Sequence, residues 1–356
     1  MTLRVAFDAR DARDPQRRGW GRYAADLLDA LRRRDDVAIG AHGGGGRLPE
    51  LAWEQVGWPA RLRADPPDLL HAPNCFLPLW RPCPGVVTVH DLAFEVHRDD
   101  FAPRTGWKYR TFTRRAVASA EAVICVSRAT ADDVCERYGT DPRRIHVVPN
   151  APSLVSGPPL EGAPPAAGPD SWASGALAAI LGDDAPPYLL AIGDLRAKKN
   201  LERLARAWKR SGLPHELVIV GAAGGAPGAE EALAERLGSL GAQLCGYVSD
   251  LDLDRLLRGA DLLVHPSLFE GFGLVLLEAM ARGVPVVCSD IPSLRETAGG
   301  AAELFDPTDV EDIARGLHDA LARRERLAAA GLKRASSFSW DRTAERTLDV
   351  YRSVVP

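Results

Sequence analysis

Short runs of aliphatic and β-branched residues alternate along the chain with segments whose apolar residues recur at helical spacing. A first long helix is expected over 22–34. Because strands that alternate with helices are typical of βαβ units, the pattern predicts an α/β protein with parallel sheets. The expected strands are 3–9, 68–74, 85–91, 122–127 and 145–150 in the first half, and 188–194, 216–221, 242–248, 261–267 and 284–290 in the second.

A segment dense in Pro, Gly and Ala at 149–172 separates the two halves and is expected to be a linker or surface loop. The sequence therefore predicts two Rossmann-like domains, residues 1–168 and 169–336, with a cleft between them. Residues 337–356 read as a separate C-terminal helix that could pack back across the hinge. Since ligands of open α/β sheets bind beyond the carboxyl ends of strands, the loops that follow strands are the candidate sites.

The composition narrows the class of protein. With 46% hydrophobic and 26% charged residues among 356, the chain is neither disordered nor a coiled coil. Its net charge of −4 provides no basic field for nucleic acid. No apolar run reaches the ~20 residues that span a bilayer, and the six cysteines are scattered without metal-binding spacing. We expect a cytoplasmic protein.

The loop after the strand 188–194 concentrates positive charge. Only five of the 44 basic residues are lysines, and two of them, Lys198 and Lys199, are adjacent. The strand ends at Gly193–Asp194, and with Arg196 the two lysines could hold a diphosphate and neutralise charge on a departing nucleotide. Asn200 is expected to cap the helix that follows. The alternative is a solvated basic loop.

A second glycine-containing turn follows the strand 261–267, in the sequence FEGFGLVLLEAM. Two glycines let the backbone approach a ligand, and the start of the next helix favours an anion. A diphosphate there would have Glu270 near a hexose and Glu278 near a ribose. The alternative is a tight strand-to-helix turn with two solvated glutamates.

Weaker signals lie elsewhere. Gly19 and Gly21 precede the first helix, and His90–Asp91 follow the strand that begins at 85. A strand-end histidine could orient a sugar, or could simply pack in the core.

Residues 104–115 carry five cations, three aromatic residues and no acid, so this helix could contact anionic lipid headgroups or could be an ordinary amphipathic helix.

One acidic motif resembles a metal site. Asp250, Asp252 and Asp254 have the Asp-x-Asp spacing of some metal-dependent nucleotide-sugar enzymes. They also begin a predicted helix, where acids favour the dipole. We expect the structural role and no metal.

These motifs, in this order, resemble the retaining glycosyltransferases of family 4, which have the GT-B architecture of two facing Rossmann-like domains. The resemblance is carried by GWGRYAADLL, HDLAFEVH, VSRATADDVCERYGTDPRRIHVVPNA, AIGDLRAKKNLERL and the Glu-x7-Glu signature at 270 and 278, and it spans nearly the whole chain. It implies an acceptor-binding first domain, a nucleotide-sugar-binding second domain and a C-terminal helix that returns to the first. The family usually has Arg at 198; Lys provides a point charge without the planar fork.

The resemblance also implies roles for single residues. His90, Lys199 and Glu270 are the implied catalytic residues, and Tyr23 and Asp91 the implied acceptor-binding residues. The implied donor-binding residues are Gly19, Gly21, Gly193, Arg196, Lys198, Lys199, Val248, Gly271, Phe272, Gly273, Leu274 and Glu278.

The implied reaction is transfer of a hexose, with retained configuration, from a GDP- or UDP-linked donor to a hydroxyl of a glycan, lipid-linked or small-molecule acceptor, without metal or cofactor. The polysaccharide mannosyltransferase branch favours mannose. An epimerase or hydrolase of the same fold, or a protein that binds nucleotide-sugars without catalysis, are the alternatives. A Rossmann oxidoreductase is disfavoured because no GxGxxG follows the first strand. The location expected is cytoplasmic, with contact at the inner membrane face through 104–115.

Overall fold

The computed structural model describes residues 2–13, 19–43, 49–153, 186–221 and 229–355. Its contacts divide the chain into two compact units. Unit 1 comprises Met1–Glu95, Arg104–Ser153 and Phe338–Pro356, and unit 2 comprises Val96–Pro103 and Leu154–Ser337. The predicted boundary at 168/169 and most of the predicted linker lie outside the described residues.

Unit 1 is built on a six-stranded parallel sheet with the strand order β2-β1-β3-β4-β5-β6. Its strands are β1 (Leu3–Asp8), β2 (Val37–His42), β3 (Leu69–Ala72), β4 (Gly85–Val89), β5 (Ala122–Cys125) and β6 (Ile145–Val147). Its α-helices are α1 (Gly19–Arg32), α2 (Glu50–Ala52), α3 (Trp58–Ala64), α4 (Ala93–Val96), α5 (Pro103–Ser119), α6 (Arg128–Tyr138) and α15 (Trp340–Val354), with a π-helical turn at Trp53–Gly57.

Unit 2 contains a second six-stranded parallel sheet, with the order β12-β11-β10-β7-β8-β9. Its strands are β7 (Tyr188–Ile192), β8 (Glu216–Val220), β9 (Gln243–Leu244), β10 (Leu262–His265), β11 (Val286–Ser289) and β12 (Glu303–Phe305). Its α-helices are α8 (Leu201–Ser211), α9 (Ala229–Ser239), α10 (Asp250–Gly259), α11 (Leu274–Met280), α12 (Pro292–Ala298), α13 (Val310–Ala322) and α14 (Arg324–Ala335). The two sheets confirm the predicted fold class of paired parallel α/β units.

Two strands were not expected from the sequence. Both β2 and β12 lie at the edge of a sheet, where a strand has one partner and one exposed side. In β2, VAIGAH, only Val37 is buried and the other positions are exposed or half-buried, and β12 is only three residues long. Neither has the continuous apolar run that marks a central parallel strand.

The structure also corrects the start of the first helix. Gly19 is the first residue of α1, so Gly19 and Gly21 lie in its first turn instead of in a loop ahead of it. A methyl group added at Gly19 would meet no atom within 4 Å, so close packing does not explain this glycine.

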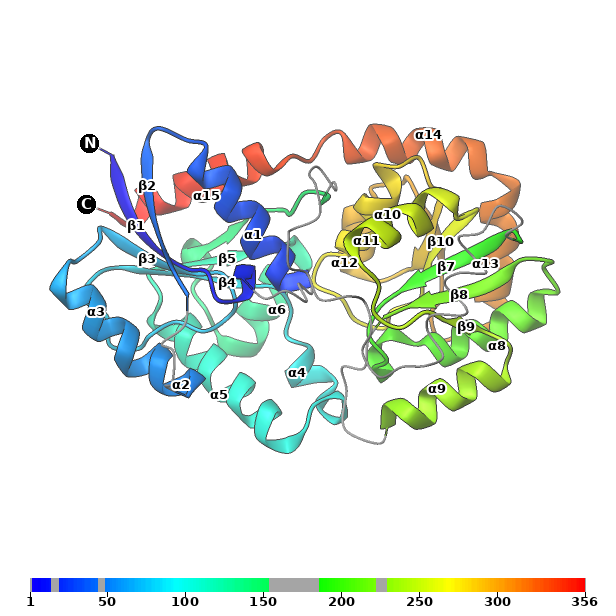
Figure 1. Cartoon of the computed structure of the whole chain (residues 1–356), viewed down its shortest axis with the longest axis horizontal. Helices are drawn as coiled ribbons and strands as arrows, with labels where there is room; N and C mark the ends of the chain where they lie inside the picture. The colour runs from blue at the N-terminus through cyan, green and yellow to red at the C-terminus, as the bar shows by residue number, and fades with distance from the viewer. Residues whose placement is uncertain (1, 14–18, 44–48, 154–185, 222–228, 356) are drawn as a thin grey trace. The chain divides into compact units, whose positions relative to one another are not determined.

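The C-terminal helix α15 packs beside α1 in unit 1 (Figure 1). Its buried Tyr351 hydroxyl bonds to His71 Nδ1 at 2.6 Å, and His71 Nε2 bonds to Thr88 Oγ1 at 2.9 Å. Thr88 in turn lies 3.1 Å from the hydroxyl of Tyr23 on α1. A chain of buried hydrogen bonds therefore joins α15 to the centre of the sheet, because each of these polar groups needs a partner away from water.

In unit 2, two glycines let the ends of β7 and β8 approach each other closely. A Cβ atom at Gly221 would lie 1.8 Å from the carbonyl oxygen of Gly193, which is impossible without a backbone shift. The loop that carries Lys198 and Lys199 begins at Gly193, so its position depends on this contact.

We predict that Gly221→Ala lowers the free energy of unfolding by about 1–3 kcal/mol, the usual range for overpacking. Gly238→Ala is the matched control, because Gly238 lies within α9 and has no atom within 4 Å of an added Cβ. That change should stabilise by ~0.5–1 kcal/mol through helix propensity. Urea denaturation measures both. Equal effects of the two substitutions would contradict the close contact at Gly221.

Candidate functional site

The best-defined polar site of unit 2 lies where the neighbouring strands β7 and β10 end. The two loops that follow these strands are tied together: the N–H of Leu268 donates to the carbonyl of Lys198 at 2.8 Å, and Asn200 Nδ2 donates to the carbonyl of Pro266 at 3.0 Å. The predicted basic loop and the predicted glutamate turn therefore meet at one edge of the sheet.

Four side chains form the centre of this site, which we call the Glu270 cluster: Lys199, His265, Ser267 and Glu270. Glu270 Oε1 accepts from Lys199 Nζ at 2.5 Å and from Ser267 Oγ at 2.8 Å, and it lies 3.2 Å from His265 Nε2. The lysine and glutamate side chains are only 15% and 11% exposed, so this is a largely buried ion pair.

The electrostatics of the cluster keep Glu270 ionised. Burial alone would raise its pKa, but Lys199 and Lys198 together with the hydrogen bond from His265 hold the pKa well below the usual range. Burial lowers the pKa of His265, so its ring is neutral at pH 7. Since a carboxylate only accepts hydrogen bonds, the ring proton belongs on Nε2.

The loop after β7 holds its lysines by shape as well as by charge. The Lys199 side chain runs over Gly193, where a Cβ would lie 3.0–3.3 Å from three of its carbons. Asn200 adopts a left-handed conformation with φ 58°. Its side chain does not cap α8 as the sequence suggested; it donates instead to the carbonyls of Pro266 and Pro307, which lie at the carboxyl-end edge.

The other two cations of the loop also lie in defined positions. Lys198 is buried, with 6% of its surface exposed, and acts on the pKa of Glu270. Arg196 pairs with Asp194 at 2.9 Å and lies over the ring of Phe101, 5.0 Å from its centroid. This loop is not the solvated basic loop that the sequence left open.

The turn before α11 is also tightly packed. Gly273 has φ 85°, and a Cβ there would lie 2.4 Å from Leu294 Cδ2, so only glycine fits. The carbonyl of the buried Phe272 accepts from Thr297 Oγ1 at 2.5 Å. Glu278 is the fifth residue of α11 and is 3% exposed. Neither glutamate is therefore solvated. Gly271 lies in this turn, and Leu274 is the first residue of α11.

Val248 and the acidic motif belong to the start of α10. Val248 is buried, and Ser249 caps the helix by accepting from the N–H of Asp252. Asp254 pairs with Arg258 at 2.8 Å and with Arg282 at 2.7 Å. Asp250 and Asp252 lie in the first turn of α10, as expected for acids at a helix start, and Asp254 is the fifth residue of the helix.

In unit 1, His90 is buried and packed between aromatic rings. Trp20 stacks on it at 5.7 Å and Tyr23 approaches edge-on at 4.7 Å, while Nε2 donates to the carbonyl of Pro73 at 2.7 Å. Burial lowers the pKa of His90 to about 4, so the ring is neutral at pH 7. Asp91 Oδ1 accepts from the N–H of Ala93 and so supports the turn into α4.

The structure corrects the role expected for Tyr23. Its side chain is completely buried, and its hydroxyl bonds to Thr88. It therefore supports His90 through ring contact and does not present its hydroxyl to an acceptor. His265 and Ser267 are site residues that the sequence analysis did not single out. Both lie at the end of the predicted strand 261–267, but that position does not show that their side chains turn toward Glu270.

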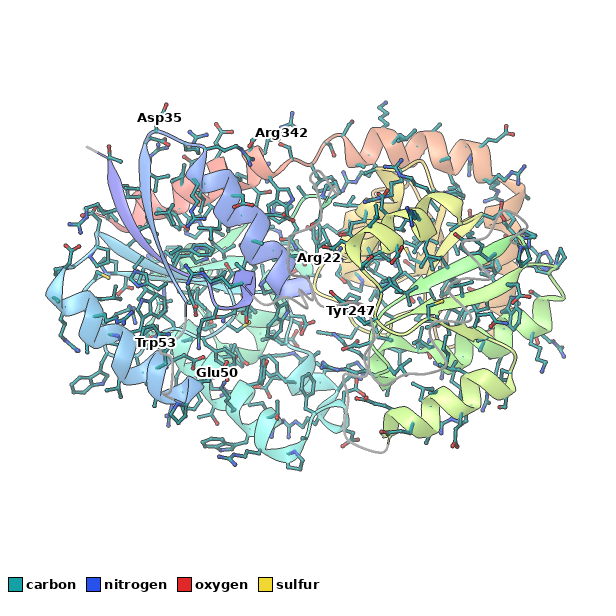
Figure 2. All side chains as sticks on the ribbon, viewed as in Figure 1. Arg22, Asp35, Glu50, Trp53, Tyr247 and Arg342 are labelled. Carbon is teal, nitrogen blue, oxygen red and sulfur yellow. The ribbon has the colours of Figure 1, made fainter. Side chains whose placement is uncertain are left out.

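The basic helix at 104–115 lies within α5, and much of its charge is used internally. Lys108 Nζ lies 2.5 Å from Oε2 of Glu50, a residue labelled in Figure 2, and stands over the ring of Phe76. Arg110 donates to the carbonyl of Phe94. Trp107 is 56% exposed. Across the described part of the chain, the helices are too short or too polar to cross a membrane.

We predict that Lys199→Met destabilises the protein by ~3 kcal/mol at pH 7, since removing one partner leaves a buried charge. In the native protein, a depressed Glu270 pKa stabilises the fold above the unfolded-state pKa, and this stabilisation is lost as the pH falls. In the variant, burial raises the Glu270 pKa, so the penalty shrinks as the pH falls from 7 toward the unfolded value. Urea denaturation of both proteins across this range measures the difference. A difference that does not change with pH would contradict the charge pair.

The chain resembles known proteins over both of its units. Residues 17–153 match the family model for Glycosyltransferase Family 4, and residues 178–334 match the model for glycosyl transferases group 1. The chain is 37% identical over 173 residues to an O-antigen chain mannosyltransferase B of Escherichia coli, covering 46% of this chain and 45% of the relative. It is 34% identical over 250 residues to a D-inositol 3-phosphate glycosyltransferase of Xylanimonas cellulosilytica, covering 67% and 58%. The chain thus spans about half the length of these two relatives.

A longer match is to an alpha-maltose-1-phosphate synthase of Mycolicibacterium smegmatis, which is 32% identical over 294 residues, 76% of this chain and 73% of the relative. Among solved structures, a sucrose-phosphate synthase from Thermosynechococcus elongatus superposes with a TM-score of 0.73 at 18% identity, over 99% of both chains. Anabaena Alr3699/HepE in complex with UDP and glucose has a TM-score of 0.72 at 18% identity, over 99% of this chain and 100% of that one. The two sheets with their polar strand ends, the family models and these relatives agree: the chain belongs to the family 4 and group 1 glycosyltransferases of the GT-B fold.

Proposed function

We propose that this glycosyltransferase moves a hexose from a nucleotide diphosphate sugar to an acceptor hydroxyl with retention of configuration. The observation that carries the proposal is the buried Lys199–Glu270 ion pair at the carboxyl ends of β7 and β10, with Lys198 acting on the same carboxylate. One site thus offers cations for a diphosphate and a charged carboxylate for sugar hydroxyls.

The protonation of Glu270 favours charge stabilisation over acid catalysis. A carboxyl whose pKa lies well below the usual range has no proton to give to a leaving group. The negative charge on the departing phosphate oxygen must then be stabilised by positive groups, and Lys199, Lys198 and Arg196 supply them. Because the protein provides this charge, we propose that transfer requires neither a metal ion nor a cofactor.

The same ion pair prepares the site for the donor. Lys199 holds Glu270 charged and oriented, so its carboxylate accepts hydrogen bonds from hexose hydroxyls without first being deprotonated or moved. The lysine gains a second anionic partner when the diphosphate binds. Glu278, buried within α11, is proposed to hold the ribose.

Retention follows from attack on the face that the diphosphate leaves. The bond between the anomeric carbon and the phosphate oxygen breaks, a bond to the acceptor oxygen forms on the same face, and the acceptor proton passes to the departing phosphate oxygen. A double displacement instead uses two carboxyl groups ~5 Å apart. The described groups in contact with the Glu270 carboxylate are Lys199, His265 and Ser267, none of which is a second carboxyl group.

The substrates are proposed from the relatives. The similarity to a mannosyltransferase favours a mannosyl donor such as GDP-mannose, and a glycan, lipid-linked or small-molecule hydroxyl as the acceptor. We propose that the protein acts in the cytoplasm on glycan or glycoside biosynthesis. Exposed Trp107 on α5 supports contact with the inner membrane face. The role of His90 in orienting the hexose stays a prediction.

A panel of GDP-, UDP-, ADP- and dTDP-sugars tests the donor by thermal shift. One nucleotide should raise the melting temperature, and a panel without any shift would contradict the assignment. Incubation of that donor with and without acceptors then separates the activities. Consumption without acceptor indicates an epimerase or hydrolase, and binding without turnover for every acceptor indicates a binding protein.

We predict that Lys199→Ala lowers turnover by ~100-fold or more, the cost of losing one stabilising group in the transition state. Lys209→Ala is the matched control, because Lys209 is an exposed lysine in the last turn of the nearby helix α8. Initial rates with saturating donor measure both variants. A near-normal rate for Lys199→Ala would remove this lysine from the mechanism.

Glu278→Ala should mainly weaken binding of the free nucleotide, because the ribose loses a hydrogen-bond acceptor. We expect a loss of about tenfold in affinity, in line with one hydrogen bond to a charged group. Calorimetric titration with the nucleoside diphosphate measures it. Unchanged affinity in a folded variant would contradict the ribose role.

A further inference from the structure

The segment Val96–Pro103 belongs to unit 2 by its contacts, although the residues on both sides of it belong to unit 1. It connects α4 to α5 and contains the short 3₁₀ turn Arg98–Asp100. Val96 and His97 end the HDLAFEVH motif, and no role was predicted from the sequence for residues 98–103. Three of its residues, His97, Asp100 and Phe101, contact the two loops that carry Lys199 and Glu270.

Asp100 makes the central contact of this segment. Its Oδ1 accepts from the N–H of Ala197 at 2.9 Å, and its Oδ2 accepts from the N–H of Lys198 at 3.0 Å. These N–H groups lie at the start of the 3₁₀ turn Ala197–Lys199, where a helical turn leaves donors without partners. The Asp100 residue is only 7% exposed, so water does not readily replace the carboxylate.

Two ring contacts hold the segment in place beside Asp100. The His97 ring lies 5.8 Å from the ring of Phe269, the residue that precedes Glu270. The guanidinium of Arg196 lies over Phe101 at 5.0 Å. The segment therefore contacts both the loop that carries Lys199 and the turn that carries Glu270. Its position thus affects the distance between these two side chains.

We propose that Asp100 is a positioning residue: its two backbone hydrogen bonds fix the turn that carries Lys198 and Lys199 at the distance from Glu270 at which both lysines serve a diphosphate. This inference rests on the proposed function. Two oxygens are needed because two N–H groups must be satisfied at once. An asparagine of the same shape offers one acceptor oxygen and turns an NH₂ group toward the other N–H.

Asp100→Asn tests the proposal, with Asp99→Asn as the matched control because Asp99 is the adjacent, exposed aspartate. The probes are the nucleoside diphosphates GDP and UDP, each compared with its free nucleoside. We expect Asp100→Asn to weaken diphosphate binding by about tenfold, the effect of one charged hydrogen bond, and to lower kcat with little change in nucleoside binding. Asp99→Asn should match the native protein in every measurement.

A second readout does not depend on any ligand. If the turn moves, Lys199 and Lys198 no longer hold Glu270 charged, and the pKa of Glu270 rises. The free energy of unfolding then increases less between pH 5 and pH 7 than it does in the native protein. Urea denaturation at the two pH values measures this change in Asp100→Asn. Asp100→Ser, whose hydroxyl oxygen lies one bond closer to the backbone than the Asp100 carboxylate oxygens, should give a shift in the same direction and serves where the asparagine variant does not fold.

The possible results distinguish the proposed function from the positioning role of Asp100. A native protein that binds neither GDP nor UDP contradicts the proposed function, while the pH readout still tests Asp100. Native-like binding and native-like pH dependence in Asp100→Asn overturn the positioning role. Equal losses for nucleoside and nucleoside diphosphate also overturn it, since they show a general loss of structure.

Discussion

The buried ion pair between Lys199 and Glu270 is the interaction on which the candidate site depends. A carboxylate at this depth loses its water and would bind a proton if it stood alone. Two lysines, a neutral histidine and a serine hydroxyl keep it charged. The site therefore holds a paired cation and carboxylate, which are the groups that the proposed nucleotide-sugar donor would contact.

The scaffold around this pair serves to bring two loops together. Parallel strands place their carboxyl ends at one edge, so the loops after β7 and β10 start as neighbours. Glycine at 193 and 221 lets the backbone and the Lys199 side chain pack closely. The Asn200 side chain then bonds to two carbonyls of the neighbouring loops, and Asp100 holds the first two N–H groups of the lysine turn. A glycine leaves the space that a Cβ would fill, the Asn200 amide donates to two carbonyls, and the Asp100 carboxylate accepts from two N–H groups.

Much of this arrangement could be predicted from the sequence. The central strands have continuous apolar runs, and the motifs that follow them placed the lysine loop and the Glu270 turn at one sheet edge; the ion pair between Lys199 and Glu270 was not predicted. The edge strands β2 and β12 could not be predicted in this way, because a half-exposed strand lacks that pattern. His265 and Ser267 were missed since local sequence does not show that a strand-end histidine and serine turn toward a carboxylate five and three residues later.

Contacts between residues that lie far apart in the sequence could not be predicted from it. Asp100 precedes its partners at 197 and 198 by almost a hundred residues, and no local pattern distinguishes it from Asp99. Tyr23 was expected to be a ligand-binding residue, but its hydroxyl is used inside unit 1. The roles of Asp100 and Tyr23 both follow from the burial of their side chains, and burial depends on tertiary packing.

We propose that the Lys199–Glu270 pair binds the donor. A crystal structure of the protein with an intact nucleotide diphosphate sugar tests it most directly. We expect Lys199 Nζ within hydrogen-bond distance of a phosphate oxygen, and a Glu270 oxygen within the same distance of a hexose hydroxyl. A donor bound with its phosphates away from the lysine turn, and with the ion pair untouched, would contradict it.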